Sequence, residues 1–447
     1  MKGECRMNMN RLLARHGLER NDAPDSHAGR LLRAALAQLG HRDGWPDEME
    51  ESRWMEALER AARQAGGRGG EHLADPRTEE LPLARIDPYM RGIVRWMNEL
   101  GIHTASCCDG HGRREPLVTL LRPPAEQELR LLRSLLPEGL RLRRQWKRTL
   151  VFECDDPSGA LPLLLDCAER LHGLLRDPER RIRIEAEWFK ERHLLDLLNV
   201  PGASGREGPI RRVLLSRLRR IADRVRTDGI GNVLAEIRMG DGPTVLLSAH
   251  MDVCREIVRG RRILQVGNVL RSSEGILGAD DRAGIAIALH VAERVRETGF
   301  RGTLKLAFTV REEVGLVGAS RIDSAFMRDI DAAIVIDRRG DRDIVTSCGG
   351  AVPFCEPSYG RLFEEAGELA GMSGWRVTAG GSSDAVVFAG KFGIDTVNLS
   401  AGYMHEHTDR ETLDVVAACE TAKLIETVLH HRMIEAWAGS RRQASAH

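Results

Sequence analysis

Short apolar runs followed by acidic and imidazole residues constrain the fold of this chain more than any other feature. Four such runs lie in its second half: 244–249 (TVLLSA), 303–310 (TLKLAFTV), 332–336 (AAIVI) and 395–400 (DTVNLS). Runs of this length and composition are typical of strands buried on both faces of a parallel sheet. Open α/β sheets bind ligands at the carboxyl ends of their strands. The runs therefore predict an α/β domain with a ligand site along one sheet edge.

The acidic and imidazole residues occur where these strands are expected to end. In chain order they are His250 and Asp252, Glu312 and Glu313, Asp337, and His407. Asp280 comes from a different element, the loop that opens a helix predicted over 281–298. Because the strand ends share one edge, we expect all of these side chains to form a single cluster.

Carboxylates and imidazoles together suit a site that holds two divalent metal ions. Two such ions, about 3.5–4 Å apart, lower the pKa of a bridging water toward about 7 and stabilise the oxyanion that forms on attack. The site needs a bridging carboxylate, ligands on each metal, and a base that binds neither ion. Mixed nitrogen and oxygen ligands favour zinc, with cobalt or manganese as replacements.

Position along the chain suggests the roles. Asp280, at a helix start between the strands, is the natural bridge. Asp252 lies two residues after His250 on the same side of a strand, so it can orient the imidazole from behind. Glu312 and Glu313 are neighbours and must point in different directions. One can therefore bind metal while the other moves a proton from water to a leaving amine.

Asp337 and His407 complete the two coordination sets. Each group also has an ordinary structural interpretation: an Asp pair before a helix is usually an N-cap, and a Glu pair at a strand end is usually solvated. The order of all the groups at successive strand ends favours one functional site.

Several motifs resemble those of the dizinc exopeptidase superfamily, which includes peptidase T-like and aminopeptidase S-like metallopeptidases and related deacylases. The resemblance covers about residues 190–437, and the N-terminal part is not recognised. The motifs are LLNVPGASGREGPIRRVL, SAHMDV, GILGADDRAGIAIAL, FTVREEVGLVGA, GGSSDAVVF and HTDRE.

The resemblance implies a role for each residue of the cluster. The first metal would be held by His250, Asp280 and Asp337, and the second by Asp280, Glu313 and His407. The catalytic residues would be Glu312, as the general base, and Asp252. The residues expected to face substrate are Ser383, Asp384 and His405. The Asp280–Asp281 peptide would be cis, and Cys254, just past the HxD motif, is expected to be a buried small residue.

Alternation of strands and helices predicts four segments. We expect a polar, partly helical leader and Gly-rich linker over 1–80, a small α+β ferredoxin-like domain over 81–182, a catalytic domain over 186–438, and a tail over 439–447. The catalytic domain should be a three-layer αβα sandwich with a mostly parallel mixed sheet. Residues 253–279 and 338–406 are too few to hold an inserted lid domain, so the hypothesis is that the 81–182 domain covers the cleft instead.

The segment Ser106–Arg113 (SCCDGHGR) stands out in the small domain. Cys107, Cys108 and His111 could be metal ligands, or the segment could bind an anion. A Cys2His set lacks a fourth ligand with recognisable spacing. We therefore favour a tight turn, in which the Asp-Gly and His-Gly pairs supply positive φ angles.

Composition narrows the class of protein. Lys plus Arg equals Asp plus Glu, at 66 each, which gives no global field for nucleic acid or an anionic membrane. The cysteines are scattered without a CxxC pair, no long apolar run or signal-like N-terminus occurs, and we expect a cytoplasmic protein. Nucleic-acid binding through RLRRQWKR (141–148) is disfavoured, because alternating arginines on one strand more often form a solvated face.

Three functions remain open at this point. The first is a zinc-dependent exopeptidase, specifically an aminopeptidase acting on short peptides. The second is an amidohydrolase that deacylates N-acyl amino acids or small amides. The third is a non-catalytic binding protein on a peptidase scaffold, which predicts lost ligands. The sequence leaves the oligomeric state open.

Overall fold

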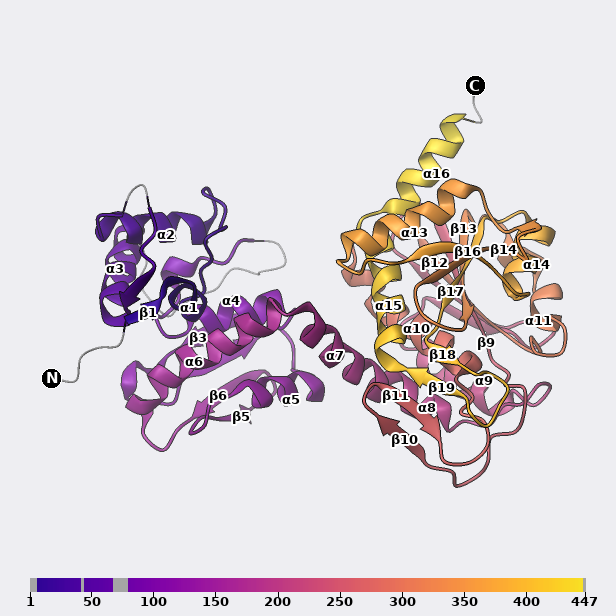
Figure 1. Cartoon of the computed structure of the whole chain (residues 1–447), viewed down its shortest axis with the longest axis horizontal. Coiled ribbons are helices and arrows are strands. Elements are labelled where there is room, and N and C mark those ends of the chain that lie inside the picture. Colours follow the sequence, from indigo (N-terminus) through magenta and orange to yellow (C-terminus); the bar gives the residue numbers. More distant parts are fainter. Residues whose placement is uncertain (1–5, 42–43, 67–78, 445–447) are drawn as a thin grey trace. The chain divides into compact units, whose positions relative to one another are not determined.

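The chain divides into two compact units, Met1–Arg181 and Ile182–His447 (Figure 1). The computed structural model describes residues 6–41, 44–66 and 79–444. Most of the segment expected as a linker, 66–80, lies outside these residues. We describe each unit by itself.

The first unit begins with helices that come from the expected leader. Its elements up to residue 66 are β1 (Arg6–Asn8), α1 (Met9–Arg15), α2 (His27–Gln38), β2 (Glu48–Glu50) and α3 (Glu51–Gln64). Leu12, Leu13 and Trp54 are fully buried. The described part of the leader thus belongs to the same compact unit as residues 79–181.

The rest of this unit follows the predicted order of elements. These are η1 (Leu83–Arg85), α4 (Arg91–Glu99), β3 (Thr104–Cys108), η2 (Gly110–Gly112), β4 (Leu117–Leu120), α5 (Glu126–Leu135), β5 (Arg141–Gln145), β6 (Thr149–Glu153) and α6 (Pro157–Leu175). Their sheet has the order β3-β4-β6-β5, and every pair in it is antiparallel. The ferredoxin-like topology is not confirmed, because no α-helix lies between β3 and β4, which pair directly.

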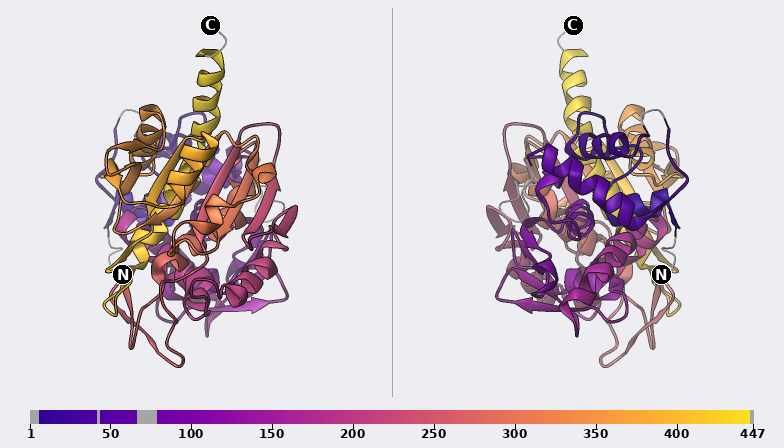
Figure 2. Two further views of the ribbon diagram at one scale, coloured as in Figure 1. Left: turned by 90° about the vertical axis from the view of Figure 1, so that its right-hand side faces the viewer. Right: turned by 90° about the vertical axis from the view of Figure 1, so that its left-hand side faces the viewer.

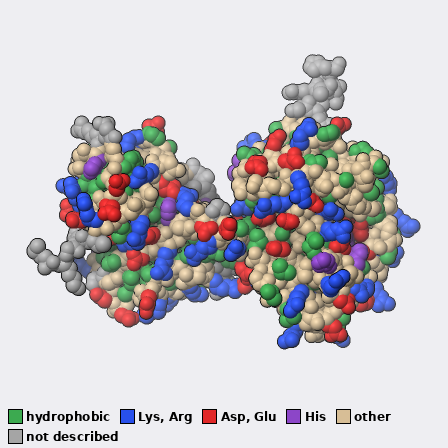
Figure 3. All heavy atoms as spheres, in the orientation of Figure 1, with side chains coloured by type: hydrophobic (Ala, Val, Ile, Leu, Met, Phe, Trp, Pro, Cys, Tyr) green, Lys and Arg blue, Asp and Glu red, His purple; other side chains and the backbone are tan. Residues whose placement is uncertain are grey.

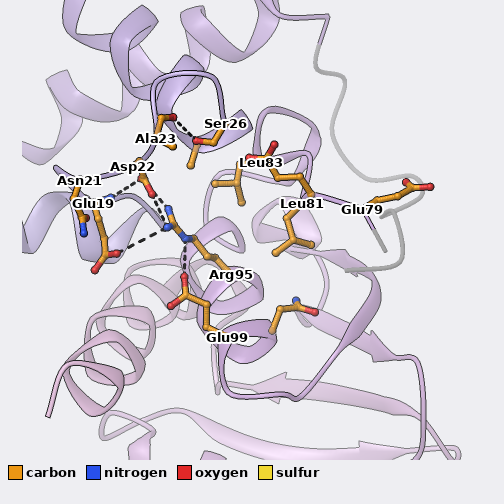
Figure 4. A pocket seen from close by; sticks show the side chains of 13 residues that line it. Glu19, Asn21, Asp22, Ala23, Ser26, Glu79, Leu81, Leu83, Arg95 and Glu99 are labelled. Atoms are coloured by element: carbon orange, nitrogen blue, oxygen red, sulfur yellow. Dashed lines mark hydrogen bonds and ion pairs between the residues drawn. The ribbon is translucent and has the colours of Figure 1, made fainter. Parts of the chain in front are cut away.

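Polar side chains of α4 tie the leader to this helix. Arg95 of α4 donates through Nη2 to Asp22 Oδ1 at 2.6 Å and through Nε to Glu99 at 3.1 Å. Figure 4 shows this guanidinium among carboxylates that line a cavity of about 470 Å³. Trp96 Nε1 donates to the carbonyl oxygen of Ala14 at 2.7 Å. The bonds from Arg95 to Asp22 and from Trp96 to Ala14 join the leader to α4.

The second unit is built on one large mixed sheet. Its main strands are β7 (Arg224–Thr227), β8 (Val233–Arg238), β9 (Thr244–His250), β12 (Thr303–Thr309), β13 (Ala332–Arg338), β14 (Asp343–Cys348), β15 (Val352–Pro353), β16 (Arg376–Gly380) and β17 (Thr396–Ser400). The order is β15-β14-β17-β13-β9-β12-β8-β7, with β16 pairing β14. The four strands predicted from apolar runs are the adjacent β17, β13, β9 and β12, and they are mutually parallel.

Helices cover both faces of this sheet, which confirms the three-layer α/β arrangement. One face carries η3 (Lys190–Leu194), α8 (Leu195–Leu198), α9 (Gly208–Leu218), α10 (Ala279–Arg294), α13 (Pro357–Leu369) and α15 (Val415–His430). The other carries α11 (Val317–Ser320), α12 (Ser324–Met327) and α14 (Asp384–Phe392). Successive residues of β9 point to opposite faces of the sheet. Leu247 packs in the core under the first group of helices, and Leu246 packs in the core under the second group.

The remaining elements lie at the margins of the second unit. The short strands β10 (Ile263–Val266), β11 (Val269–Ser272), β18 (Tyr403–Met404) and β19 (Thr412–Asp414) form a small antiparallel sheet. The segment 253–279 is thus a hairpin with its flanking loops, as its length required. After α15 comes a further helix, α16 (Met433–Ala444), which projects beyond the unit in both views of Figure 2. The helices α7 (Pro178–Phe189) and η4 (Val295–Glu297) complete the chain.

Acidic and basic side chains are interspersed on the face drawn in Figure 3. This pattern agrees with a formal net charge of zero. Among the described residues, no helix combines the length and apolar character needed to cross a bilayer.

Trp54 tests whether the leader is an integral part of the first unit. Its side chain is 0% exposed on α3, and removing a buried aromatic side chain costs about 3–5 kcal/mol. We expect Trp54→Ala to lower the free energy of unfolding by about that amount in urea titrations followed by circular dichroism. The control is Trp146→Ala, since Trp146 is 79% exposed. Equal stability of the two variants would contradict an integral leader.

Candidate metal centre

Adjacent parallel strands bring the predicted residues to one edge of the sheet. His250 is the last residue of β9 and pairs in register with Thr309, the last residue of β12. Glu312 and Glu313 follow β12, and Asp337 lies near the end of β13. The shared register of these strands is the reason why residues far apart in sequence meet.

Asp280 lies at the centre of the cluster. Its Oδ1 is 3.0 Å from His250 Nε2, and its Oδ2 is 3.1 Å from His407 Nε2. His250 Nε2 also lies 3.4 Å from Asp337 Oδ1, and His407 Nε2 lies 2.7 Å from Glu313 Oε2. Each oxygen of Asp280 thus faces a different imidazole and its partner carboxylate. This is the arrangement expected of a carboxylate that bridges two ions.

The two imidazoles control the protonation of Asp280. Burial opposes ionisation, but hydrogen bonds and charges from His250 and His407 lower the pKa of Asp280 below its usual value. The hydrogen bond to Asp280 in turn raises the pKa of His407 to about 9, against the effect of burial. Asp280 is therefore held as an anion.

Asp252 supports the site in a different way from the expected one. The Nδ1 atom of His250 lies 3.0 Å from the carbonyl oxygen of Asp252 and 3.6 Å from its carboxylate. The carboxylate instead accepts hydrogen bonds from the backbone N–H groups of Glu312 and Glu313, at 2.9 and 3.2 Å, and from the Ser204 hydroxyl at 2.7 Å. Asp252 thus orients the imidazole through its backbone and the glutamate pair through its side chain.

The glutamate pair diverges as expected for consecutive residues. Glu313 Oε2 approaches His407, whereas Glu312 Oε2 lies 4.0 Å from His250 Nε2. Burial raises the pKa of Glu312 to about 9, and the Asp337 carboxylate adds to this increase. Burial likewise raises the pKa of Glu313 to about 7. Arg311, which precedes the pair, has a φ of +53°, a backbone conformation rare for a non-glycine residue.

Further buried groups hold the ligands, and the sequence analysis did not assign them. Tyr403 donates its hydroxyl to Asp337 Oδ1 at 3.0 Å, and Asn398 accepts from the backbone N–H of Asp337 at 2.9 Å. Asp281 accepts from the backbone N–H of His250 at 3.1 Å. Asn398 could have been found as a polar residue inside an apolar strand, and Asp281 as the second residue of the Asp pair.

Glu411 fixes the start of α10. Its carboxylate accepts hydrogen bonds from the backbone N–H groups of Gly278, at 2.7 Å, and Asp280, at 3.0 Å. The backbone of Asp280 and Asp281 is not helical, and the peptide between them is cis, as the resemblance implies. Glu411 belongs to the HTDRE motif, so this motif supplies both His407 and the group that orients Asp280.

The residues fit divalent cations. Sets that could hold an ion include His250 with Asp280 and Glu313, and His250 with Glu312 and Asp337. Glu313 is 6% exposed at its side chain, and its Oε1 has no hydrogen-bond partner. Burial and the surrounding acids raise the pKa values of three carboxyls in the cluster. Bound cations would satisfy the unpaired oxygen and remove this repulsion.

The residues expected to face substrate lie elsewhere in the hydrogen-bond network. Ser383 is buried, accepts from Asn398 Nδ2 at 3.1 Å and caps α14. Asp384 is buried and accepts from Thr309 Oγ1 at 2.6 Å. His405 is exposed on the same loop as His407. Their role in substrate binding stays a prediction, and the contacts of Ser383 and Asp384 are those of residues that shape the loop.

Cys254 lies nearer to the cluster than a small core residue would. Its Sγ and ligand atoms of Glu313 and His407 all lie within 4.8 Å of one another. The residue is half-buried, and burial raises the pKa of its thiol to about 11.

Comparisons with known proteins identify aminopeptidases as similar to this chain. The model of the M42 glutamyl aminopeptidase family matches residues 264–347. A putative aminopeptidase of Acetivibrio thermocellus is 22% identical over 328 residues, which cover 53% of this chain and 98% of that protein. Aminopeptidase PepT of Bacillus cereus, a solved structure, is 19% identical, with a TM-score of 0.49 over 55% of this chain and 98% of its own. A tripeptidase of Staphylococcus aureus is 17% identical, with a TM-score of 0.49 over 56% and 99%. The chain is thus similar, over just over half of its length, to proteins that bear these names.

Proposed function

We propose that the second unit is a metal-dependent aminopeptidase that removes the terminal residue of short peptides. The observation that carries this proposal is the Asp280 carboxylate, whose two oxygens face two separate imidazole and carboxylate sets. The similarity to aminopeptidases supports the choice of reaction. A non-catalytic scaffold would have no reason to keep every ligand and the additional glutamate.

Two sets of residues would hold two divalent ions, zinc being favoured by mixed nitrogen and oxygen ligands. They are His250, Asp280 and Asp337 for the first, and Asp280, Glu313 and His407 for the second. Bound there, the ions would polarise the scissile carbonyl and lower the pKa of the attacking water. Tyr403 and Asn398 keep Asp337 directed at the first set.

Glu312 performs the proton transfer in this proposal. Cations bound beside it would favour its ionised form against the burial that raises its pKa. The carboxylate then removes a proton from the attacking water and delivers it to the leaving amine, so that the peptide C–N bond breaks as the amine becomes neutral. Its side chain is 12% exposed, which keeps bulk water from competing for the proton. Asp252 holds the backbone of Glu312 and so aims this carboxylate.

Glu312→Gln tests the proton-transfer role. The amide cannot accept the proton, and general acid–base catalysis contributes about 10²–10⁴-fold. We expect kcat on aminoacyl amides to fall by about this factor, while metal analysis shows the same bound metal as in the wild type. Unchanged activity would rule out Glu312 as the base.

Substrate class is tested with the wild-type enzyme on a panel of aminoacyl amides and N-acyl amino acids. An aminopeptidase cleaves the first group, which carries a free amino terminus. Removal of metal with a chelator should abolish this activity, and zinc, cobalt or manganese should restore it. Hydrolysis of only the N-acyl compounds would instead identify a deacylase, and full activity without metal would refute the mechanism.

Asp252→Asn tests the positioning role of this carboxylate. One oxygen becomes an amide that faces backbone N–H donors, so the glutamate pair loses its anchor. Supporting partners of metal ligands change metal affinity by about 10–100-fold. We expect weakening of this order in zinc titrations monitored by calorimetry. Ser204→Ala, which removes a single hydrogen bond to the same carboxylate, is the control and should have a smaller effect; equal affinities in all three proteins would contradict the role.

A further inference from the structure

A second group of potential metal ligands lies in the first unit. It contains Asp87, Cys108, Asp109 and His111, and the ligand atoms of these side chains all lie within 4.8 Å of one another. The sequence suggested only Cys107, Cys108 and His111, a set without a fourth ligand. The fold supplies Asp87, which precedes α4 in sequence and lies beside the loop that follows β3.

The register of β3 selects one of the two cysteines. Neighbouring residues of a strand point to opposite faces. Cys107 is 5% exposed, and its thiol lies against the backbone of Asp87. Only Cys108 has its sulfur grouped with the ligand atoms of the cluster. The sequence pair Cys107-Cys108 therefore contributes a single thiol to this group.

The loop after β3 turns His111 back toward the carboxylates. Gly110, His111 and Gly112 all have positive φ, at +73°, +52° and +65°. Asp109 Oδ1 accepts a hydrogen bond from the backbone N–H of His111 at 2.9 Å and lies 3.0 Å from its Nδ1. The expected turn is thus present, and its geometry brings an imidazole to a carboxylate.

The two carboxylates of the group are buried side by side. Asp87 and Asp109 are 2% and 3% exposed, and Asp87 Oδ2 accepts from the backbone N–H of Asp109 at 3.1 Å. Arg91 is buried and forms an ion pair with Glu59, from Nη2 to Oε1 at 2.7 Å. Burial lowers the pKa of Arg91, and the charges of Glu59, Asp87 and Asp109 oppose this effect. One guanidinium thus serves three carboxylates. Buried anions require such compensation, and a divalent cation supplies it.

We propose that Asp87, Cys108, Asp109 and His111 bind one transition-metal ion, of which Zn²⁺ fits best. Four donors of sulfur, nitrogen and oxygen type match the number of ligands in a closed zinc site. A thiolate disfavours Mg²⁺ and Ca²⁺, which prefer oxygen ligands only. On binding, the Cys108 thiol loses its proton to solvent and the sulfur–metal bond forms. The ion would join the loop after β3 to the segment before α4. This inference does not depend on the function proposed for the second unit.

The proposal is tested on the full-length protein with Zn²⁺ and Co²⁺ as probes. Cobalt bound to a thiolate gives a sulfur-to-metal charge-transfer band in the near ultraviolet. The test variants are Cys108→Ser, which removes the thiolate, and His111→Asn, which removes the imidazole. His111 is 72% exposed at its side chain, and Asn tolerates its positive φ, so the second variant leaves the fold undisturbed.

Two cysteine variants serve as controls. Cys107→Ala alters the neighbouring cysteine, which is buried and is not among the grouped ligand atoms. Cys254→Ala removes the thiol near the other cluster and shows how much of the cobalt band, if any, arises there.

Cys108→Ser and His111→Asn should each lose one equivalent of zinc per chain, or bind it at least about tenfold more weakly, because even supporting partners of a ligand have effects of that size. Cys108→Ser should also lose its share of the cobalt band, while Cys107→Ala keeps both zinc and band. Zinc content and cobalt spectra that are the same in Cys108→Ser, His111→Asn and the wild type would overturn the proposal. So would a loss in Cys107→Ala equal to that in Cys108→Ser, since it would indicate a general effect on folding.

Discussion

The interaction on which the second unit depends is the placement of Asp280 between two imidazoles. A buried carboxylate with an oxygen directed at each of His250 and His407 fixes the distance between two sets of ligands. This placement needs a backbone that is not helical at the start of α10, and Glu411 holds that backbone through two hydrogen bonds. This placement concentrates negative charge, which the bound cations of the proposed site would offset.

Buried carboxylates outside the proposed ligand sets hold the backbone around the centre. Asp252, Asp281 and Glu411 each accept hydrogen bonds from backbone N–H groups next to a proposed ligand. Such bonds are strong because the acceptor is charged and water is excluded. They fix the backbone next to the proposed ligands, as supporting partners do around a metal site. The centre thus consists of loops held by buried carboxylates at one end of the sheet.

The first unit also uses acidic side chains to join segments that are distant in sequence. Paired charges join the leader to α4, and a carboxylate before α4 approaches the loop after β3. Both units therefore place acidic side chains where chain segments that are distant in sequence converge. The two clusters differ in the kinds of potential ligand that they contain. The cluster of the first unit includes a thiol, whereas carboxylates and imidazoles make up most of the cluster in the second unit.

Much of the second unit could be predicted from sequence because its signals are local. Apolar runs identify β9, β12, β13 and β17, and parallel strands necessarily share their carboxyl edge. The side chains that follow these strands could then be grouped without knowing any distance. The helices and strands of the first unit could also be predicted from local patterns. Its topology could not, because neither β3 nor β4 contains a sequence pattern that identifies the other as its partner.

Tertiary structure decided which groups act through which atoms. Sequence placed Asp252 near His250, but only the fold shows that its carboxylate bonds to the glutamate backbone while its carbonyl oxygen approaches the imidazole. Sequence likewise identified Cys108 and His111, whereas Asp87 joins them only in the fold, where it accepts a hydrogen bond from the backbone N–H of Asp109. The physical reason is the same in both cases. Periodicity and strand ends are properties of a few consecutive residues, while hydrogen-bond partners are chosen by segments that meet only after the chain has folded.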